Sequence, residues 1–239
     1  MKLLKHVMQA LVLASLVTSA HAVTDISTCQ TITLRGAYRL TQNLESGYYC
    51  IVIVSSNVTL DLQGHTINGN RTPYSQGIHV PSGTRVQDIV VRNGTVAFFE
   101  VGVNLAAATH GVRVENMNVH SNKLGMRVGS GAVVASNIVH DNDFTGIVVS
   151  GDGENGALVA NNLLYDNKGH GIRVDEAGSA VIGNVARRNG ADGIFVVCPA
   201  NVQNNVATLQ QSTSGVDLRL VTTGCLDVNN VAPKKKFGF

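Results

Sequence analysis

A short repeat dominates this sequence. A glycine followed by an apolar–x–apolar triplet recurs at intervals of 21 to 25 residues. Alternation of apolar and variable positions is the pattern of a short strand with one buried face. The copies begin at Gly77, Gly102, Gly125, Gly146, Gly171, Gly193 and Gly215. Repetition at this interval predicts a solenoid, in which each coil buries its apolar side by stacking on its neighbours.

Asparagine keeps the same interval. One series is Asn137, Asn162, Asn184, Asn205 and Asn230, and a second is Asn122, Asn142, Asn167 and Asn189. A coil of about 22 residues has room for three short strands and three turns, so stacked coils form parallel sheets. We expect each Asn amide to hydrogen-bond to the coils above and below. Asn also tolerates the left-handed backbone that such corners need.

The N-terminus has the pattern of a secretory signal peptide over residues 1–22. Lys2 and Lys5 precede an apolar run from Val7 to Val17, and Ala22 ends a small-residue cleavage sequence. The run is too short to span a bilayer comfortably, so we expect no membrane span and a secreted or periplasmic protein. These two lysines account for the whole formal charge of +2. The remainder is neutral, which argues against nucleic-acid binding.

The four cysteines form two local pairs, Cys29 with Cys50 and Cys198 with Cys225. An even number of cysteines in an exported chain predicts disulfides. Four cysteines allow three connectivities, and coil geometry favours the local one. Residues one coil apart are about 4.8 Å apart, a spacing that a disulfide tolerates. No CxxC pair supports a zinc site.

The coils resemble the pectin-lyase-like superfamily of right-handed parallel β-helices. The stretch from Leu60 to Ile67, Leu-Asp-Leu-Gln-Gly-His-Thr-Ile, is similar to the entry segment of that superfamily. The resemblance implies an all-β, single-stranded right-handed parallel β-helix over residues 51–231, with about 8 coils of 21 to 25 residues. It also implies an N-terminal cap at residues 23–50, and a basic tail follows at 232–239. Handedness rests on the resemblance and on the preference for right-handed parallel crossovers.

In a packed solenoid, function lies on outward positions and turns. The repeat register places His120, His140, Tyr165 and Arg187 in one outward column. Asp141, Asp166 and Arg188 follow in the next position of three coils. Stacked about 4.8 Å apart, these side chains form a face that could bind an acidic sugar and move a proton. The alternative is a solvated surface with no ligand, because the outside of any soluble solenoid is polar.

Two functions fit this face. The first is a non-catalytic protein that binds polysaccharide or a cell-surface glycan, which the short turns favour. The second is a small lyase or epimerase on uronate chains, with His140 or Tyr165 as base and Arg187 on the carboxylate. We expect no cofactor, although Asp141 and Asp166 could bind Ca²⁺. We also expect a monomer.

The sequence does not match a polygalacturonase. Gly169-His170-Gly171 is similar to an element of that family, but Gly171 is the repeat glycine. Inverting hydrolysis needs two placed carboxylates, and the paired Asp-Asp element is missing. The Asp-Pro-His motif of mannuronan epimerases is also absent.

Overall fold

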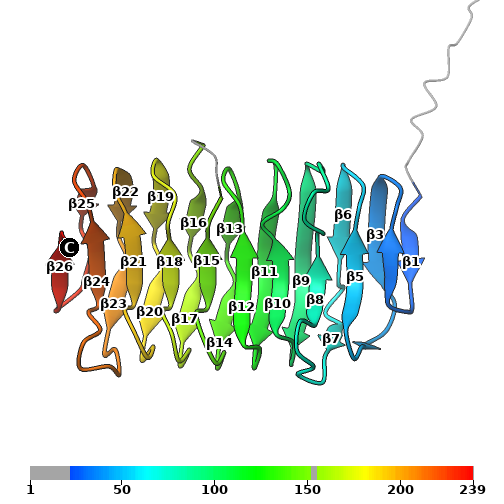
Figure 1. Ribbon diagram of the computed structural model, residues 1–239, viewed down its shortest axis with the longest axis horizontal. Coiled ribbons are helices and arrows are strands. Elements are labelled where there is room, and N and C mark those ends of the chain that lie inside the picture. The colour runs from blue at the N-terminus through cyan, green and yellow to red at the C-terminus, as the bar shows by residue number, and fades with distance from the viewer. Residues whose placement is uncertain (1–21, 152–154, 239) are drawn as a thin grey trace, which may run out of the picture.

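The computed structural model describes residues 22–151 and 155–238, and the predicted signal peptide lies outside them apart from Ala22. The described residues form an all-β solenoid of about nine turns, with no helix among them. Figure 1 shows the coils stacked along one axis, with the strands across it. Within the same ranges, no helix is long and apolar enough to cross a membrane.

One sheet of ten strands runs the length of the solenoid and faces the viewer in Figure 1. All its pairings are parallel, as stacked coils require. Its strands in order are β2 (Gln30–Ile32), β5 (Tyr49–Ile53), β8 (Gln76–His79), β10 (Val101–Leu105), β12 (Leu124–Val128), β15 (Ile147–Val149), β18 (Ile172–Val174), β21 (Ile194–Val197), β24 (Leu218–Val221) and β26 (Lys235–Phe237).

A 16-stranded sheet forms the rest of each coil and divides into two rows. The first row is β1 (Thr24–Ile26), β3 (Gly36–Leu40), β6 (Val58–Asp61), β9 (Ile89–Ala97), β11 (Arg113–His120), β13 (Val133–Ala135), β16 (Leu158–Ala160), β19 (Ser179–Ile182), β22 (Ala200–Gln203) and β25 (Leu226–Val228). The second is β4 (Leu44–Glu45), β7 (Thr66–Asn68), β14 (Ile138–His140), β17 (Leu163–Tyr165), β20 (Val185–Arg187) and β23 (Val206–Thr208). The strands β9 and β11 run through both rows and join them.

The expected cap and tail both contribute strands to these sheets. β1 pairs with β3, and β2 pairs with β5, so residues 24–53 continue the coil pattern. β26 pairs with β24 at the other end. There Lys235 Nζ lies 3.0 Å from Asp227 Oδ2 in a partly buried ion pair.

Two buried ladders of amides confirm the role expected for asparagine. In the first, Asn162 Nδ2 donates to Asn184 Oδ1 at 2.9 Å, and Asn184 Nδ2 donates to Asn205 Oδ1 at 3.0 Å. In the second, Asn142 Nδ2 donates to Asn167 Oδ1 at 2.8 Å. Each amide also donates to a strand carbonyl, so a buried polar column is satisfied throughout.

The prediction that the ladder asparagines themselves adopt the left-handed backbone conformation is wrong. The ladder asparagines do not adopt it; the residue before each one does, as at Asn161 (φ 56°) and Asp166 (φ 54°). The bend therefore occurs one position earlier, which leaves the following amide directed into the core.

The repeat glycines have a steric reason. A Cβ on Gly146 would lie 2.8 Å from the carbonyl oxygen of Gly171 and 3.0 Å from Asn167 Nδ2. Any side chain would therefore collide with the next coil and with its amide ladder. The alignment of the seventh glycine, Gly215, with the other repeat glycines is wrong. The residue opposite Ile194 is Leu218 rather than Val216, because the last turn is two residues longer.

Both predicted disulfides are confirmed. Cys29 and Cys50 have Cα atoms 4.4 Å apart, and Cys198 and Cys225 are 5.0 Å apart. Each bridge joins two neighbouring coils near one end of the described part of the solenoid. Disulfides form in oxidising compartments, so they indicate an extracytoplasmic location.

Candidate functional site

The predicted outward column forms as expected from the register. β11, β14, β17 and β20 place His120 opposite His140, His140 opposite Tyr165, and Tyr165 opposite Arg187. The His120 and His140 ring centroids lie 4.9 Å apart, and those of His140 and Tyr165 lie 4.7 Å apart. Arg187 Cζ lies 5.7 Å from the Tyr165 ring centroid, a cation–π contact. The four side chains therefore form one stack along the solenoid axis.

The orientation of the rings decides what they can offer a ligand. The interplanar angles are 18° for the two histidines and 6° for His140 and Tyr165. Faces that stack this closely on each other are not free to stack on a sugar. The column is therefore a row of polar side chains rather than an open aromatic platform.

His140 is held at both ring nitrogens. Its Nδ1 lies 2.7 Å from Asp141 Oδ2, and its Nε2 lies 3.1 Å from Asn118 Oδ1. His120 Nδ1 lies 3.1 Å from Ser121 Oγ. Burial, together with the neighbouring His140, lowers the pKa of His120 below 6.5. A catalytic base needs a free nitrogen near substrate, so His140 would first have to release a partner.

Asp166 and Arg188 satisfy each other. Arg188 Nε and Nη2 donate to the two carboxylate oxygens of Asp166 at 2.9 and 2.6 Å. This bidentate pair holds the pKa of Asp166 below its usual 3.8. Arg187, in contrast, forms no ion pair with another described residue. Of the two predicted arginines, Arg187 is therefore the one whose charge is available to a ligand.

The side chains suggested for Ca²⁺ are engaged elsewhere, Asp141 with His140 and Asp166 with Arg188. Across residues 22–151 and 155–238, no three His, Cys, Asp or Glu side chains converge as metal ligands would. The two suggested carboxylates therefore do not converge with further acidic ligands, as a calcium centre built on them would need.

The stack extends further toward the N-terminus than the sequence indicated. Phe98 meets His120 edge-on, with ring centroids 6.2 Å apart and an interplanar angle of 82°. Arg71 Cζ lies 5.7 Å from the Phe98 centroid. Phe98 has φ 64° and is a turn residue, so a search for alternating strand positions misses it. The signal was available by counting back from Asn122, because Phe99 occupies the ladder position of that coil.

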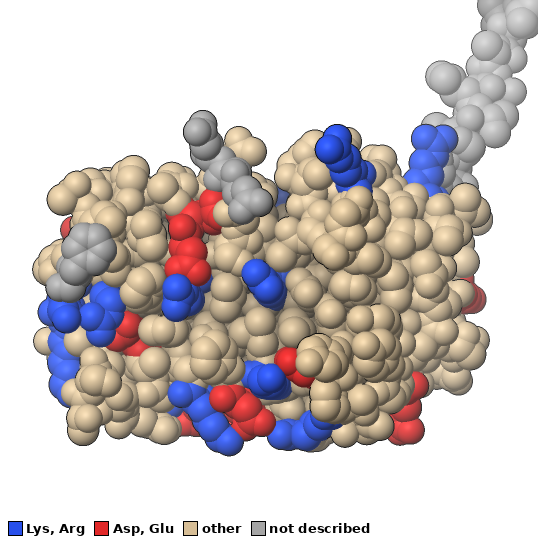
Figure 2. Space-filling view, in the orientation of Figure 1, with Lys and Arg blue, Asp and Glu red and all other residues tan. Residues whose placement is uncertain are grey.

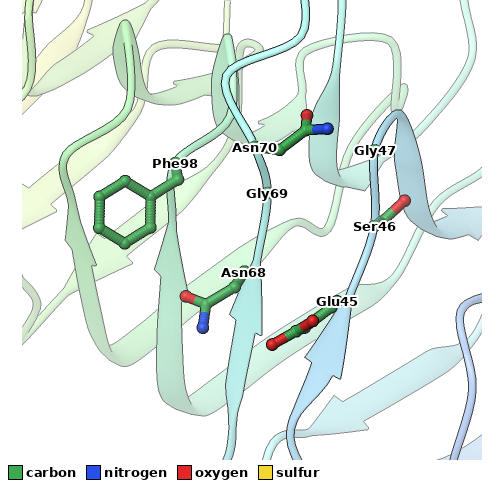
Figure 3. A pocket seen from close by; sticks show the side chains of 7 residues that line it. All are labelled: Glu45, Ser46, Gly47, Asn68, Gly69, Asn70 and Phe98. Carbon is green, nitrogen blue, oxygen red and sulfur yellow. The ribbon is translucent and has the colours of Figure 1, made fainter.

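A depression of about 430 Å³ lies beyond Phe98. The column continues into it, because Ala97 pairs with Asn68 and Asn68 pairs with Glu45. Figure 3 shows Glu45, Asn68 and Phe98 side by side on neighbouring coils around this hollow. Its lining is Glu45, Ser46, Gly47, Asn68, Gly69, Asn70 and Phe98.

Beside the stack, most charges neutralise each other. Lys123 Nζ lies 3.0 Å from Glu100 Oε1, and Lys168 Nζ lies 2.6 Å from Asp143 Oδ1. Arg71 Nη1 contacts Asp143 from the other side at 2.9 Å. These cations lower the pKa of Asp143. Figure 2 shows small groups of opposite charge on a largely neutral surface, so no extended basic face is visible there.

His170 has a structural role. Its Nδ1 accepts a hydrogen bond from the Asp192 backbone N–H at 3.2 Å. The buried Asp192 carboxylate is held by Arg219 at 2.7 and 3.0 Å. Burial lowers the pKa of His170. The Gly-His-Gly element thus belongs to the coil and its packing.

The family model for the right handed beta helix region matches residues 38–181. The chain belongs to this family. No curated protein sequence matches the chain.

Solved right-handed β-helix structures share the fold. The A-module of a mannuronan C-5 epimerase from Azotobacter vinelandii is 17% identical over 83% of this chain and 61% of that one, with a TM-score of 0.50. The enzymatically active domain of tailspike protein 2 from bacteriophage CBA120 is 14% identical over 91% of this chain and 38% of that one, with a TM-score of 0.59.

The Dettilon tailspike protein is similarly distant, at 14% identity over 90% of this chain and 53% of that one, with a TM-score of 0.55. This chain thus spans between 38% and 61% of the length of these three structures. At these identities the likeness concerns the fold.

Proposed function

We propose that this β-helix protein binds an extended acidic polysaccharide along the outward column and does not cleave it. The observation that carries the proposal is the stack of His120, His140 and Tyr165 with the unpaired Arg187 at its end. Polar side chains repeat along the solenoid axis at about 4.8 Å, which suits a ligand that is itself a repeating chain. Arg187 supplies a guanidinium for a uronate carboxylate.

Binding without reaction follows from the state of the side chains. His140 has a partner on each ring nitrogen, and Asp166 is held by Arg188. Two free carboxylates flanking a bound sugar, as glycoside hydrolysis needs, are therefore not available in this column. The disulfides and the predicted signal peptide support action outside the cytoplasm, in the periplasm or beyond the cell.

One observation favours a lyase or epimerase as a second candidate. The Tyr165 hydroxyl makes no hydrogen bond to another residue within the described ranges, and Arg187 lies against its ring. In its deprotonated form, the Tyr165 hydroxyl could accept a proton from a uronate whose carboxylate Arg187 neutralises.

A binding assay with two matched variants tests the proposal. Alginate, pectin and glycosaminoglycans would be titrated by calorimetry into the wild type, Arg187→Ala and Arg127→Ala. Arg127 is an exposed arginine in β12, which belongs to the ten-stranded sheet and not to the sheet that carries the column. Loss of a charge-assisted carboxylate contact should weaken binding at least tenfold in Arg187→Ala, with Arg127→Ala unchanged. No binding by the wild type, or equal losses in both variants, would refute it.

The same samples separate binding from catalysis. A lyase would release unsaturated uronates, seen as a rise in ultraviolet absorbance, and an epimerase would change the uronate composition by NMR. Either activity, if abolished by Tyr165→Phe, would replace the binding proposal with the second candidate.

A further inference from the structure

The outward column carries opposite charges toward its two ends. Glu45 in β4 and Arg187 in β20, which Thr208 of β23 follows, are joined by the pairings through Asn68, Ala97, His120, His140 and Tyr165. At about 4.8 Å per coil, six steps place the two ends about 29 Å apart. Neither Glu45 nor Arg187 forms an ion pair with any residue that the structure describes. The column is therefore acidic at its N-terminal end and basic at its C-terminal end.

The depression at the acidic end suits hydroxyl groups. Its 430 Å³ lies within the range that small-molecule sites occupy. The Asn68 amide forms no hydrogen bond within the described part of the chain, so it offers both a donor and an acceptor. The Glu45 carboxylate is exposed and points to the same hollow as Asn68 (Figure 3). A sugar hydroxyl can donate to that carboxylate, whereas a uronate carboxylate would be repelled by it.

We infer that the column selects a heteropolysaccharide, with a neutral sugar in the Glu45 depression and an acidic sugar at Arg187, over a homopolymer of uronates. This inference rests on the proposed function and adds the class of polymer that the column takes. A chain that carries a carboxylate on every unit is attracted electrostatically at Arg187 and repelled at Glu45. A chain that mixes acidic and neutral units can place a hydroxyl-bearing unit at Glu45 and a carboxylate at Arg187.

Glu45→Gln is the discriminating variant. It removes the negative charge and keeps the size and one hydrogen-bond acceptor. Glu115→Gln is the matched control, because Glu115 lies in β11 outside the column and the net charge changes equally. Both glutamates are on the surface or partly exposed, so the fold should persist in both variants.

The probes are hyaluronan, whose units alternate between uronate and N-acetylhexosamine, and polygalacturonate, whose units are all acidic. We expect the wild type to bind hyaluronan more tightly than polygalacturonate. Glu45→Gln should bind polygalacturonate threefold to fivefold more tightly, because a like charge has been removed. Its hyaluronan affinity should change less than twofold. The gain should vanish at about 1 M salt, where the Debye length is about 3 Å.

The outcomes distinguish this inference from the proposed function. If Arg187→Ala weakens glycan binding but Glu45→Gln leaves polygalacturonate affinity unchanged, the polymer preference is wrong and the column still binds glycan. If Glu115→Gln produces the same gain as Glu45→Gln, net charge is the cause and the inference is overturned. If neither polymer binds the wild type, both proposals fail together.

Discussion

Asn167→Ala is expected to be among the most destabilising single substitutions in this protein. The Asn167 side chain is 1% exposed and makes four hydrogen bonds to neighbouring coils. Its Oδ1 accepts from the Asn142 backbone N–H at 3.2 Å and from Asn142 Nδ2 at 2.8 Å. Its Nδ2 donates to Val139 O at 3.0 Å and to Asn189 Oδ1 at 3.0 Å. Alanine removes all four at once.

The expected loss follows from these contacts. A hydrogen bond between neutral groups contributes about 1 kcal/mol net, so the four together give about 4 kcal/mol. The neighbouring groups cannot recover their partners from solvent, because Asn142 and Asn189 are also buried. For a domain of this size, about 4 kcal/mol corresponds to a fall in Tm of roughly 8–16 °C.

Urea unfolding followed by circular dichroism would measure the free energy of unfolding. Asn104→Ala is the matched control, since Asn104 is half-buried on the outer face and its amide donates to Gln76 Oε1 at 2.9 Å. It should lose less than about 1 kcal/mol. Asn167→Asp keeps the shape of the side chain but replaces the Nδ2 donor with a carboxylate oxygen, which faces Val139 O and Asn189 Oδ1. It should therefore lower the free energy of unfolding at least as much as alanine does. Equal losses in Asn167→Ala and Asn104→Ala would refute the role given to the ladder.

Three further predictions concern packing, pH and the covalent bridges. Gly146→Ala places a Cβ against the next coil, so it should cost about 2 kcal/mol or more by the same denaturation assay, and a loss below 0.5 kcal/mol would contradict the steric reason. Burial holds the folded pKa values of His120 and His170 below 6.5, so the unfolded chain binds protons first. The free energy of unfolding should therefore fall as pH drops below about 6.5, until the lowered folded pKa values are passed; equal stability at pH 7.5 and 5.5 would contradict this. The paired change Cys198→Ser and Cys225→Ser opens a closed segment of 27 residues and should cost about 3.5 kcal/mol; if reducing the wild type causes no comparable loss, the bridge does not stabilise the fold.

The sequence predicted those features that depend on a regular coil. From Gly102 to Asn205 each coil carries its own glycine and asparagine, so counting along the repeat located the column of His120, His140, Tyr165 and Arg187. Both disulfides followed from the same geometry. The pattern could not say which side chains would be neutralised, because Arg188 reaches back to Asp166 through a rotamer choice that spacing does not determine.

Counting along the repeat fails in the irregular coils. Near the N-terminus, Phe99 replaces the ladder asparagine and an insertion follows Asn68, so the repeat does not mark Glu45 as a member of the column or Phe98 as its neighbour. Near the C-terminus, the longer turn before Leu218 shifts the register by two residues, so Gly215 does not mark the strand that pairs with β21, and Asp217 is buried.

The buried ladder and the outward column are consecutive in sequence, and this links stability to binding. Tyr165 and Asp166 immediately precede Asn167, and His140 and Asp141 immediately precede Asn142. The hydrogen bonds between Asn side chains of neighbouring coils fix the spacing and register of the strands. That spacing sets the 4.7 Å between the His140 and Tyr165 ring centroids. A substitution inside the ladder should therefore loosen the stack and weaken the proposed glycan binding, although the asparagine is buried below the column. A substitution at Arg187 should affect binding alone, because its side chain is exposed and is not part of the ladder. The stability and the glycan affinity should therefore be measured for both Asn167→Ala and Arg187→Ala. Loss of affinity in Asn167→Ala would show that the buried ladder holds the column in its binding geometry, and unchanged affinity would contradict this.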